Sequence, residues 1–237
     1  MKLSAPIYRL RQEAKLSARK HGTPLHQSLD EIAQREGFSR WSLLVARSAK
    51  ALPASRLSEQ LQPCDLVLLA GRPGHGKTTV GLEVVSQTVK AGNSAYFFTL
   101  EFYSSELEQR LSDIGFDLTN QNEHFHIDTS DQICADYIIS QLADAPKGSI
   151  VVIDYMQVLD QKRDHATLDV QLMTLRRFAD VAGITFVLIC QIDRAFEQSG
   201  KDFPGIEDVR LPNPVDLSVF NKFCFVHNER MSIKNAA

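Results

Sequence analysis

Residues 71–79 read GRPGHGKTT, a stretch whose composition is typical of a loop that binds phosphate: Gly71, Arg72, Pro73, Gly74, His75, Gly76, Lys77, Thr78 and Thr79. Glycines at its two ends let the backbone turn tightly enough for its N–H groups to face a phosphate. Lys77 can reach the terminal phosphates of a nucleotide, and the Thr78 hydroxyl can hold Mg²⁺. The pattern predicts a P-loop in which all nine residues border the ligand.

The segments on either side of this loop support the prediction. An apolar run at 66–70 predicts a buried strand, and a helical pattern follows from Val80 to Ala91. A helix in this place directs its positive N-terminal end at the phosphate. A glycine turn that binds nothing is the alternative, and the flanking pattern disfavours it. Because such a loop binds through its backbone, we expect the His75 side chain to point to solvent.

Three more apolar runs end in polar side chains, namely Glu101, Asp154 and Gln191. The carboxyl ends of parallel strands meet at one edge of a sheet, so we expect all three beside the P-loop. The run before Asp154 is a Walker B pattern, and its carboxylate is expected near Mg²⁺ together with Thr78. The Gln191 amide can hydrogen-bond a γ-phosphate or the attacking water. The alternatives are an aspartate that caps a turn and an amide that is paired within the protein.

Composition indicates one main domain with a basic appendage. The chain has 237 residues, of which 43% are hydrophobic and 23% charged, and its net charge of −3 gives no overall attraction to nucleic acid. The charge is uneven, because residues 1–50 hold ten Lys and Arg against four Asp and Glu. We therefore divide the chain into a basic helical module (1–50), a linker (51–63) and a main domain (64–237).

The basic module shows the pattern of three short helices. Apolar residues recur at helical spacing from Leu3 to Ala14, Pro24 starts a second helix that Gly37 ends, and a third carries Trp41. We favour an appendage that docks on the main domain or on a neighbouring subunit. Helix-turn-helix DNA binding around Asp30–Ser48 is the alternative, and it lacks an evident polar recognition face.

The cysteines and the hydropathy pattern indicate a cytoplasmic protein. Four cysteines lie far apart without C-x-x-C spacing, so we expect reduced, structural thiols. The N-terminus has no continuous apolar core of a signal peptide, and no run approaches the length of a bilayer span. We expect no membrane association.

Residues 193–216 are rich in Gly and Pro and have no clear period. Long connections of this kind within compact domains are usually functional or disordered. Arg194, Lys201 and Arg210 are the candidate contacts to nucleic-acid phosphates. Acidic residues outnumber them in this segment, so a strong electrostatic footprint for DNA is not expected. The last apolar run, 219–226, predicts an edge strand.

Taken together, these motifs resemble the RecA-like ATPase domain of DnaB-type replicative helicases. The P-loop includes the Arg-Pro pair of that family, and the other matching stretches are Phe98-Thr99-Leu100-Glu101, Asp154-Tyr155-Met156-Gln157, Cys190-Gln191-Ile192-Asp193-Arg194 and Asp208-Val209-Arg210. The match covers roughly residues 57–228, and several motifs in the right order are more specific than one. The resemblance implies an α/β fold of the RecA-like P-loop type, with a mainly parallel sheet flanked by helices.

The resemblance also implies roles for the site residues. It assigns Lys77 to phosphate, Thr78 and Asp154 to the metal, Glu101 to polarising the attacking water, and Gln191 to sensing the γ-phosphate. Glu101, Lys77 and Gln191 form the catalytic set. The expected function is a Mg²⁺-dependent ATP hydrolase that acts on single-stranded DNA as a helicase does. A homo-oligomer and a protein partner are the candidate assemblies.

One departure from the family pattern favours a second hypothesis. In the family, a strand beyond the position of Asn228 carries a Lys/Arg pair that reaches the neighbouring nucleotide site, whereas here Arg230 and Lys234 are poor candidates. An arginine finger can be worth about 10³–10⁵ in turnover, so slow hydrolysis is expected unless another chain supplies the charge. The second hypothesis is a nucleotide-dependent switch that binds a protein partner without unwinding DNA. A small-molecule kinase is less favoured, because Glu101 and Gln191 suit water activation.

Overall fold

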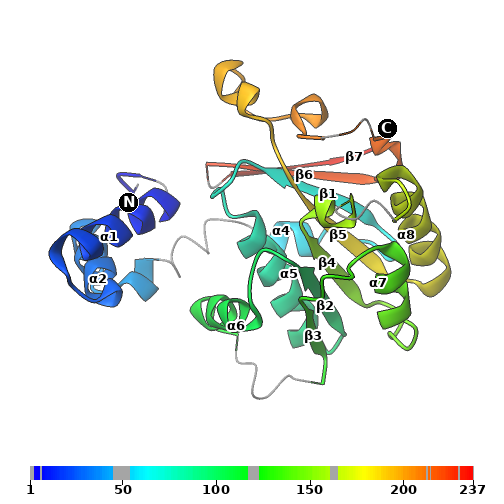
Figure 1. The fold of residues 1–237 in the computed structure, drawn as a ribbon, viewed down its shortest axis with the longest axis horizontal. Coiled ribbons are helices and arrows are strands. Elements are labelled where there is room, and N and C mark those ends of the chain that lie inside the picture. The colour runs from blue at the N-terminus through cyan, green and yellow to red at the C-terminus, as the bar shows by residue number, and fades with distance from the viewer. Residues whose placement is uncertain are drawn as a thin grey trace.

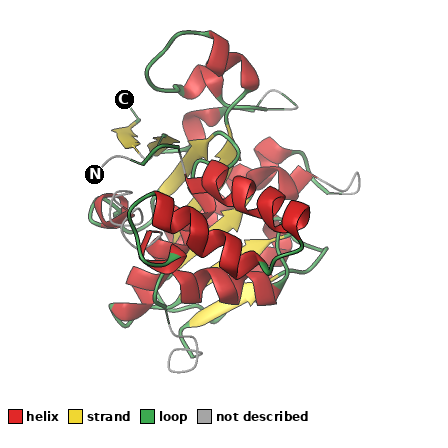
Figure 2. Cartoon of the chain, turned by 90° about the vertical axis from the view of Figure 1, so that its left-hand side faces the viewer, coloured by secondary structure: helices red, strands yellow, loops and turns green. Residues whose placement is uncertain are grey.

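The main domain is built on a seven-stranded sheet with the order β3-β2-β4-β5-β1-β6-β7. The computed structural model describes residues 3–5, 7–44, 54–116, 123–160, 165–211, 213, 215–228 and 230–236. Helices cover both faces of the sheet (Figure 1), and Figure 2 shows several of them lying over the strands. The expected α/β architecture is confirmed.

The sheet strands are β1 (Leu66–Gly71), β2 (Ala95–Thr99), β3 (Phe125–Asp128), β4 (Ile150–Asp154), β5 (Thr185–Gln191), β6 (Lys222–His227) and β7 (Arg230–Asn235). The α-helices of this domain are α4 (Ala54–Ser58), α5 (Lys77–Lys90), α6 (Ser104–Asp113), α7 (Ala135–Gln141) and α8 (Leu168–Ala182). The short 3₁₀ helices are η2 (Met156–Asp160), η3 (Arg194–Gln198), η4 (Ile206–Asp208) and η5 (Leu217–Val219).

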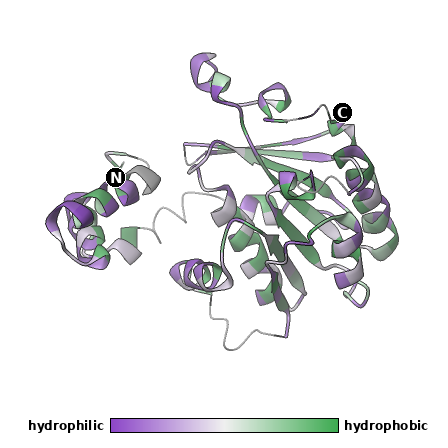
Figure 3. Ribbon diagram, in the orientation of Figure 1, coloured by the Kyte–Doolittle hydropathy of each residue, from purple (hydrophilic) through white to green (hydrophobic). Residues whose placement is uncertain are grey.

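All neighbouring strands are parallel except β6 and β7. β1 is buried along its whole length and β5 nearly so, as expected for parallel strands covered on both faces. One apolar cluster lies between the sheet and helices α7 and α8, and a second lies between the sheet and helices α4, α5 and α6. Figure 3 shows hydrophobic residues concentrated along the strands. The carboxyl ends of the parallel strands therefore share one edge.

The expectation of an edge strand at 219–226 is wrong. β6 lies between β1 and β7, and β7 pairs antiparallel with it, so the described chain does carry a strand beyond Asn228. Only Met231 and Ile233 of β7 pack against the core, which leaves too short an apolar pattern for prediction. Asn228 has φ +47°, the left-handed conformation that tight hairpin turns use.

Helix α5 lies close to the sheet because residue 81 is a glycine. A Cβ atom at Gly81 would be 3.1 Å from both Ile189 Cδ1 and Val152 Cγ1, which is tighter than ordinary contact. Close packing of this kind leaves no room for added atoms without a shift of helix or strand. The first turn of α5 is thereby held against the ends of the central strands.

The N-terminal helices α1 (Ile7–His21) and α2 (Leu25–Arg35) form a core of their own, made of Leu10, Ala14, Ile32, Ala33 and Leu44. A helical turn follows at 41–44, where the Trp41 backbone N–H donates to Asp30 Oδ1 at 2.8 Å. Residues 45–53, which include Ser48 of the candidate helix-turn-helix and the start of the expected linker, lie outside the described residues. Within the described ranges, none of the helices is long and apolar enough to span a bilayer.

Candidate functional site

The P-loop joins β1 to α5 at the carboxyl edge of the sheet. Gly74 and Gly76 have φ values of +80° and +90°, a region that residues with a side chain adopt only at a cost. A Cβ atom on Gly71 would lie 2.7 Å from the Val226 carbonyl oxygen, so the root of the loop is pressed against β6. The glycines of the motif are thus required by the path of the backbone.

Lys77 is a buried cation at the start of α5. It is 9% exposed, and its Nζ donates to the Arg72 carbonyl oxygen at 3.1 Å. Burial lowers the pKa of Lys77 from its ordinary value, and the charges of Asp154 and Glu101 oppose this shift. An ammonium has three donors, and this bond accounts for one of them among the described residues. A buried charge of this kind is strongly stabilised by an anion.

Thr78 and Asp154 meet beside Lys77. The Thr78 hydroxyl donates to Asp154 Oδ2 at 2.8 Å, although the two residues are 76 positions apart. Asp154 is the last residue of β4 and is 1% exposed. Its burial and the charge of Glu101 raise the pKa of Asp154 to about 6. Hydroxyl and carboxylate oxygens are the ligand types that Mg²⁺ prefers, so this pair fits a magnesium site.

Glu101 and Gln191 also reach this edge. Glu101 is exposed just beyond β2, its backbone N–H donates to Thr99 Oγ1 at 3.0 Å, and its charge acts on both Lys77 and Asp154. Gln191 ends β5 directly opposite Gly71 of β1. The structure therefore brings together the residues that the strand-end argument selected.

Two P-loop side chains contact other parts of the chain. The Arg72 Nε donates to Glu197 Oε1 at 2.8 Å. His75 stacks on His227 with 5.1 Å between ring centroids, and its Nδ1 accepts from the Asn228 backbone N–H at 3.3 Å. Burial and the neighbouring His227 lower the pKa of His75 to about 4, so its ring is neutral at pH 7. The expectation that His75 points to solvent is wrong, because β6 supplies a partner from far along the sequence.

The three candidate nucleic-acid contacts differ in their surroundings. Lys201 forms ion pairs with Glu207 at 2.8 Å and Asp208 at 3.1 Å. The Arg210 guanidinium lies 3.5 Å from the Gln191 amide oxygen. Arg194 forms neither an ion pair nor a side-chain hydrogen bond with the residues that the structure describes. Their role on DNA stays a prediction, and Arg194 is the cation most available for it.

Gln157 is a site residue that sequence reasoning did not select. Its Nε2 donates to the Arg210 carbonyl oxygen at 3.0 Å and lies 3.3 Å from Cys190 Sγ. It thereby connects the segment after β4 to the segment after β5. The signal was present, because Gln157 closes the stretch quoted with Asp154, but its spacing alone gives no partner.

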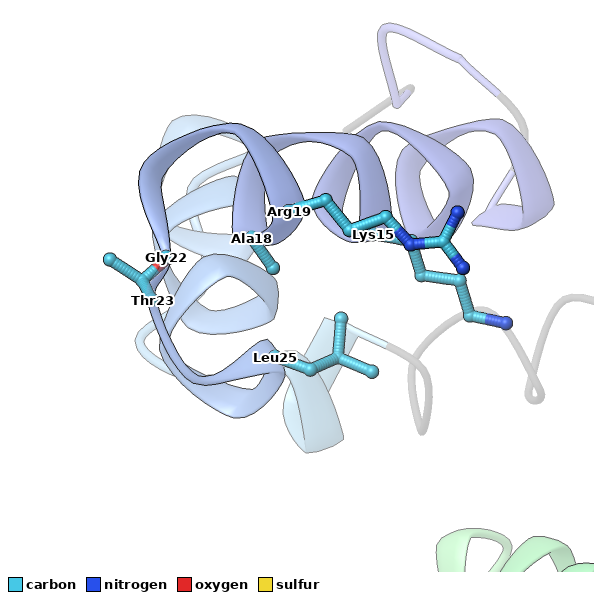
Figure 4. Close-up of a pocket in the computed structure, with 6 residues that line it drawn as sticks. All are labelled: Lys15, Ala18, Arg19, Gly22, Thr23 and Leu25. Carbon is cyan, nitrogen blue, oxygen red and sulfur yellow. The ribbon is translucent and has the colours of Figure 1, made fainter.

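A separate shallow pocket lies on the N-terminal helices and is lined by Lys15, Ala18, Arg19, Gly22, Thr23 and Leu25 (Figure 4). None of the predicted site residues lines it. Lys15 and Arg19 are one helical turn apart on α1, and their charged ends lie on the same side of the pocket in Figure 4. The pocket is not part of the P-loop site.

Comparison with known proteins supports the same interpretation of the main domain. A family model described as an ATPase, KaiC, matches residues 56–219, which is more than half of the chain and includes every residue of the site. The chain belongs to the KaiC ATPase family. This KaiC-family chain contains a RecA-like ATPase domain.

Curated relatives of the KaiC-family chain are replicative DNA helicases named DnaB. That of Mycoplasma genitalium is 25% identical over 241 residues, covering 84% of this chain and 51% of the relative. That of Synechocystis is 28% identical over 182 residues, covering 63% and 21%. That of Haemophilus influenzae is 23% identical over 215 residues, covering 75% and 46%. The chain thus spans about half or less of the length of these relatives.

Solved structures show the same fold. A DnaB-like replicative helicase, studied with its interactions with primase, has a TM-score of 0.59 and 17% identity, covering 91% of this chain and 64% of that one. A KaiC-like protein from Pyrococcus horikoshii gives 0.53 and 19%, covering 69% and 71%. A third structure, an ATPase domain, gives 0.58 and 18%, covering 75% and 76%. The KaiC-family chain therefore has the RecA-like fold and is related to DnaB helicases.

Proposed function

We propose that this chain is a Mg²⁺-dependent ATP hydrolase that couples hydrolysis to single-stranded DNA. The observation that carries the proposal is the 2.8 Å hydrogen bond between Thr78 and Asp154 beside the buried ammonium of Lys77. A hydroxyl, a carboxylate and an ammonium in this arrangement match the needs of a metal-bound triphosphate. The names of the curated relatives support the helicase part of the proposal.

Lys77 and the loop backbone would bind the phosphates. The glycine conformations at 74 and 76 leave room for N–H groups to face an anion, and the N-terminal end of α5 adds a favourable dipole. Lys77 is desolvated in advance, so its interaction with phosphate would be stronger than in water. These features supply binding and charge neutralisation.

Thr78 and Asp154 would hold the magnesium ion. When bound, Mg²⁺ would bridge phosphate oxygens and neutralise the charge that develops on them. Asp154 must be ionised to serve this role, and its raised pKa makes that condition sensitive to pH near 6. The buried position of Asp154 fixes its carboxylate, because the side chain has little freedom to rotate.

Glu101 would polarise the attacking water, and Gln191 would orient the γ-phosphate or that water. Glu101 is exposed and has no hydrogen bond to its carboxylate among the described residues, so the carboxylate is available to accept from water. Positioning and electrostatic stabilisation account for most catalysis of phosphoryl transfer, with little covalent chemistry by the protein. The arrangement suits hydrolysis better than transfer to a metabolite.

The DNA-binding part rests on residues 193–211 and on the relatives. Arg194, Lys201 and Arg210 would contact phosphates of a single strand, with Arg194 as the most available cation. The N-terminal module (1–50) would dock on the main domain or on a neighbouring copy. In a homo-oligomer, Arg230 and Lys234 of β7 are the basic residues nearest in sequence to the family position for a neighbouring site.

A nucleotide-dependent switch is the second candidate function. The pairing of Lys201 with two carboxylates weakens the case for DNA binding at the same segment. In this alternative the protein hydrolyses ATP slowly and binds a protein partner in its ATP state. The two candidates share the nucleotide site and differ in what residues 193–211 contact.

Steady-state ATPase activity with and without single-stranded DNA, at low and moderate salt, tests the proposal. We expect Mg²⁺-dependent hydrolysis that Lys77→Ala and Glu101→Gln abolish, and stimulation by DNA that fades with salt. Glu108→Gln, an exposed carboxylate change on α6, serves as the matched control for Glu101→Gln. Absence of ATP binding by the wild-type protein contradicts the proposal. Hydrolysis that is indifferent to DNA supports the switch instead.

A further inference from the structure

Arg72 is held at both its backbone and its side chain. Its carbonyl oxygen accepts from Lys77 Nζ at 3.1 Å. Its Nη1 donates to the Ile192 carbonyl oxygen at 3.0 Å, and its Nε donates to Glu197 Oε1 at 2.8 Å. The side chain is only 12% exposed, so the guanidinium is committed to these partners. Arg72 therefore connects the proposed phosphate-binding lysine to the segment that follows β5.

A second contact joins the same two regions through aromatic rings. The His227 ring stacks on His75 of the P-loop and meets the edge of Phe196 with 5.1 Å between centroids. Phe203 approaches the same ring at 6.1 Å. Phe196 is buried and belongs to η3, the short helix that also contains Glu197. The P-loop and η3 thus share two neighbouring contacts, one ionic and one aromatic.

The segment from 193 to 208 is closed on itself at its base. The Asp193 N–H donates to the Asp208 carbonyl oxygen, and the Arg210 N–H donates to the Gln191 carbonyl oxygen, both at 2.8 Å. The Asp193 side chain accepts from the Ala195 N–H and so caps η3. In Figure 1 this segment forms the golden helical turns that project beyond β5. Its outer part can therefore move as a unit about a base that stays attached to β5.

Occupancy of the P-loop competes with one of these bonds. A phosphate that accepts from Lys77 Nζ takes the donor that the Arg72 carbonyl oxygen holds. The change is felt by Arg72, whose guanidinium holds Glu197 on η3. Coupling between two sites is reciprocal, so a ligand of the segment would alter nucleotide affinity by the same factor.

We propose that Arg72 is a positioning residue that couples occupancy of the P-loop to the conformation of residues 193–208. His75 and His227 provide the second support of this coupling. The inference rests on the proposed nucleotide binding and deepens it. It removes the Arg72 side chain from the set of phosphate ligands and places it between the nucleotide site and the segment assigned to DNA.

The test uses the full chain and two separate measurements. Fluorescent ATP-analogue titration gives nucleotide affinity, and amide hydrogen exchange of residues 194–208 reports on the segment with and without Mg²⁺ and ATPγS. In the wild type we expect bound nucleotide to change exchange by about fivefold or more, the lower end of ordinary coupling. In Arg72→Ala we expect affinity within about threefold of wild type and no change in exchange.

Three further variants separate coupling from general destabilisation. Arg72→Lys keeps the charge but cannot bridge two acceptors in the same geometry, so we expect a reduced response. Glu197→Ala should behave like Arg72→Ala, whereas its matched control Glu108→Ala should retain the full response. Single-stranded DNA should shift nucleotide affinity in the wild type and not in Arg72→Ala, which a purely structural role would not produce.

Two results overturn the inference. One is wild-type protein that binds nucleotide with no change in exchange at 194–208. The other is Arg72→Ala that keeps both binding and the full change. Wild-type protein that binds no nucleotide at all instead refutes the proposed function on which the inference rests, and the affinity measurement identifies that case by itself.

Discussion

The carboxyl edge of the sheet and the segment at 193–211 handle charge in opposite ways. At the edge, Lys77 and Asp154 are 9% and 1% exposed, and burial moves the pKa of each away from its ordinary value. In the segment, Lys201 and Glu207 are 41% and 66% exposed by side chain and are paired with each other. Buried charges need a partner to offset desolvation, whereas exposed pairs contribute little.

This difference separates residues built for a ligand from residues that are already satisfied. The edge holds polar groups whose partners are incomplete within the described chain, so a charged ligand would add to their stability. The segment neutralises most of its own charge, so its affinity for a polyanion rests on few side chains. Charge counts from sequence treat the two regions alike.

The largest expected effect comes from removing the buried ammonium. Lys77→Ala should lower ATP hydrolysis by about 10²–10³-fold, the scale seen when a preorganised donor to a developing charge is lost. Lys90→Ala changes an exposed lysine at the other end of α5 and should leave the rate unchanged. Steady-state phosphate release measures both. Equal rates for the two variants would remove the distinction between buried and exposed cations.

The pH dependence of Asp154 gives the next effect. Because its pKa is raised to about 6, Asp154 is mostly ionised at pH 7 and mostly protonated at pH 5, and hydrolysis should fall about tenfold between them. Stability should move the other way. The folded state binds this proton more tightly than the unfolded state, so the contribution of Asp154 to stability falls as pH rises from about 4 to 6.

Rate profiles and urea unfolding from pH 4.5 to 8 measure both trends. Asp154→Asn should abolish hydrolysis and flatten the part of the stability profile between pH 4 and 6. A wild-type rate that is constant from pH 5 to 7 would mean that Asp154 does not need to ionise for turnover.

Glu83 tests whether burial alone makes a carboxylate unfavourable. It lies on α5, and burial raises its pKa to about 7 without an ion pair or hydrogen bond among the described residues. The folded state therefore binds its proton more tightly than the unfolded state, and stability falls as pH rises from about 4.5 to 7. Glu83→Gln should stabilise the protein by about 1–3 kcal/mol at pH 8 and by almost nothing at pH 4.5.

Urea midpoints at the two pH values measure this effect, with Glu108→Gln on exposed α6 as the matched control. A stabilisation that is equal at both pH values would assign the gain to packing rather than to charge. A destabilisation at pH 8 would show that Glu83 is ionised and paired in solution.

The smallest effect concerns the segment's own cations. Arg194→Gln should weaken binding of single-stranded DNA by a few-fold and reduce the salt dependence by about one phosphate contact. Lys201→Gln should have less effect, because Glu207 and Asp208 already neutralise that lysine. Fluorescence anisotropy with a labelled oligonucleotide at several salt concentrations compares them. A larger loss for Lys201→Gln would show that its ion pairs open on binding.

The sequence predicted those parts of the molecule that depend on local pattern. The P-loop, β1 and α5 follow from glycine spacing and periodicity, and the strand ends at Asp154 and Gln191 follow from runs of apolar residues. Thr78 and Asp154 could be paired in advance because parallel strands share an edge. This rule gives proximity without requiring any side-chain detail.

The parts that escaped prediction depend on contacts between distant segments. Arg72 meets Glu197 across 125 positions, and His75 meets Asn228 across 153. Neither pair has a periodic signal, because each joins two irregular segments. β7 was missed for a related reason, since its stability comes from pairing with β6 and only two of its side chains are buried against the core.

Gly81 shows how a residue without functional groups can set the geometry of a reaction. The contacts that a Cβ would make at 3.1 Å mean that the helix cannot accept even alanine without moving by a few tenths of an ångström. That movement would be carried along α5 to Thr78, one helical turn away, while Asp154 stays with the sheet. Variation at position 81 among natural or designed sequences therefore bears on turnover, although the residue touches none of the groups assigned to the chemistry.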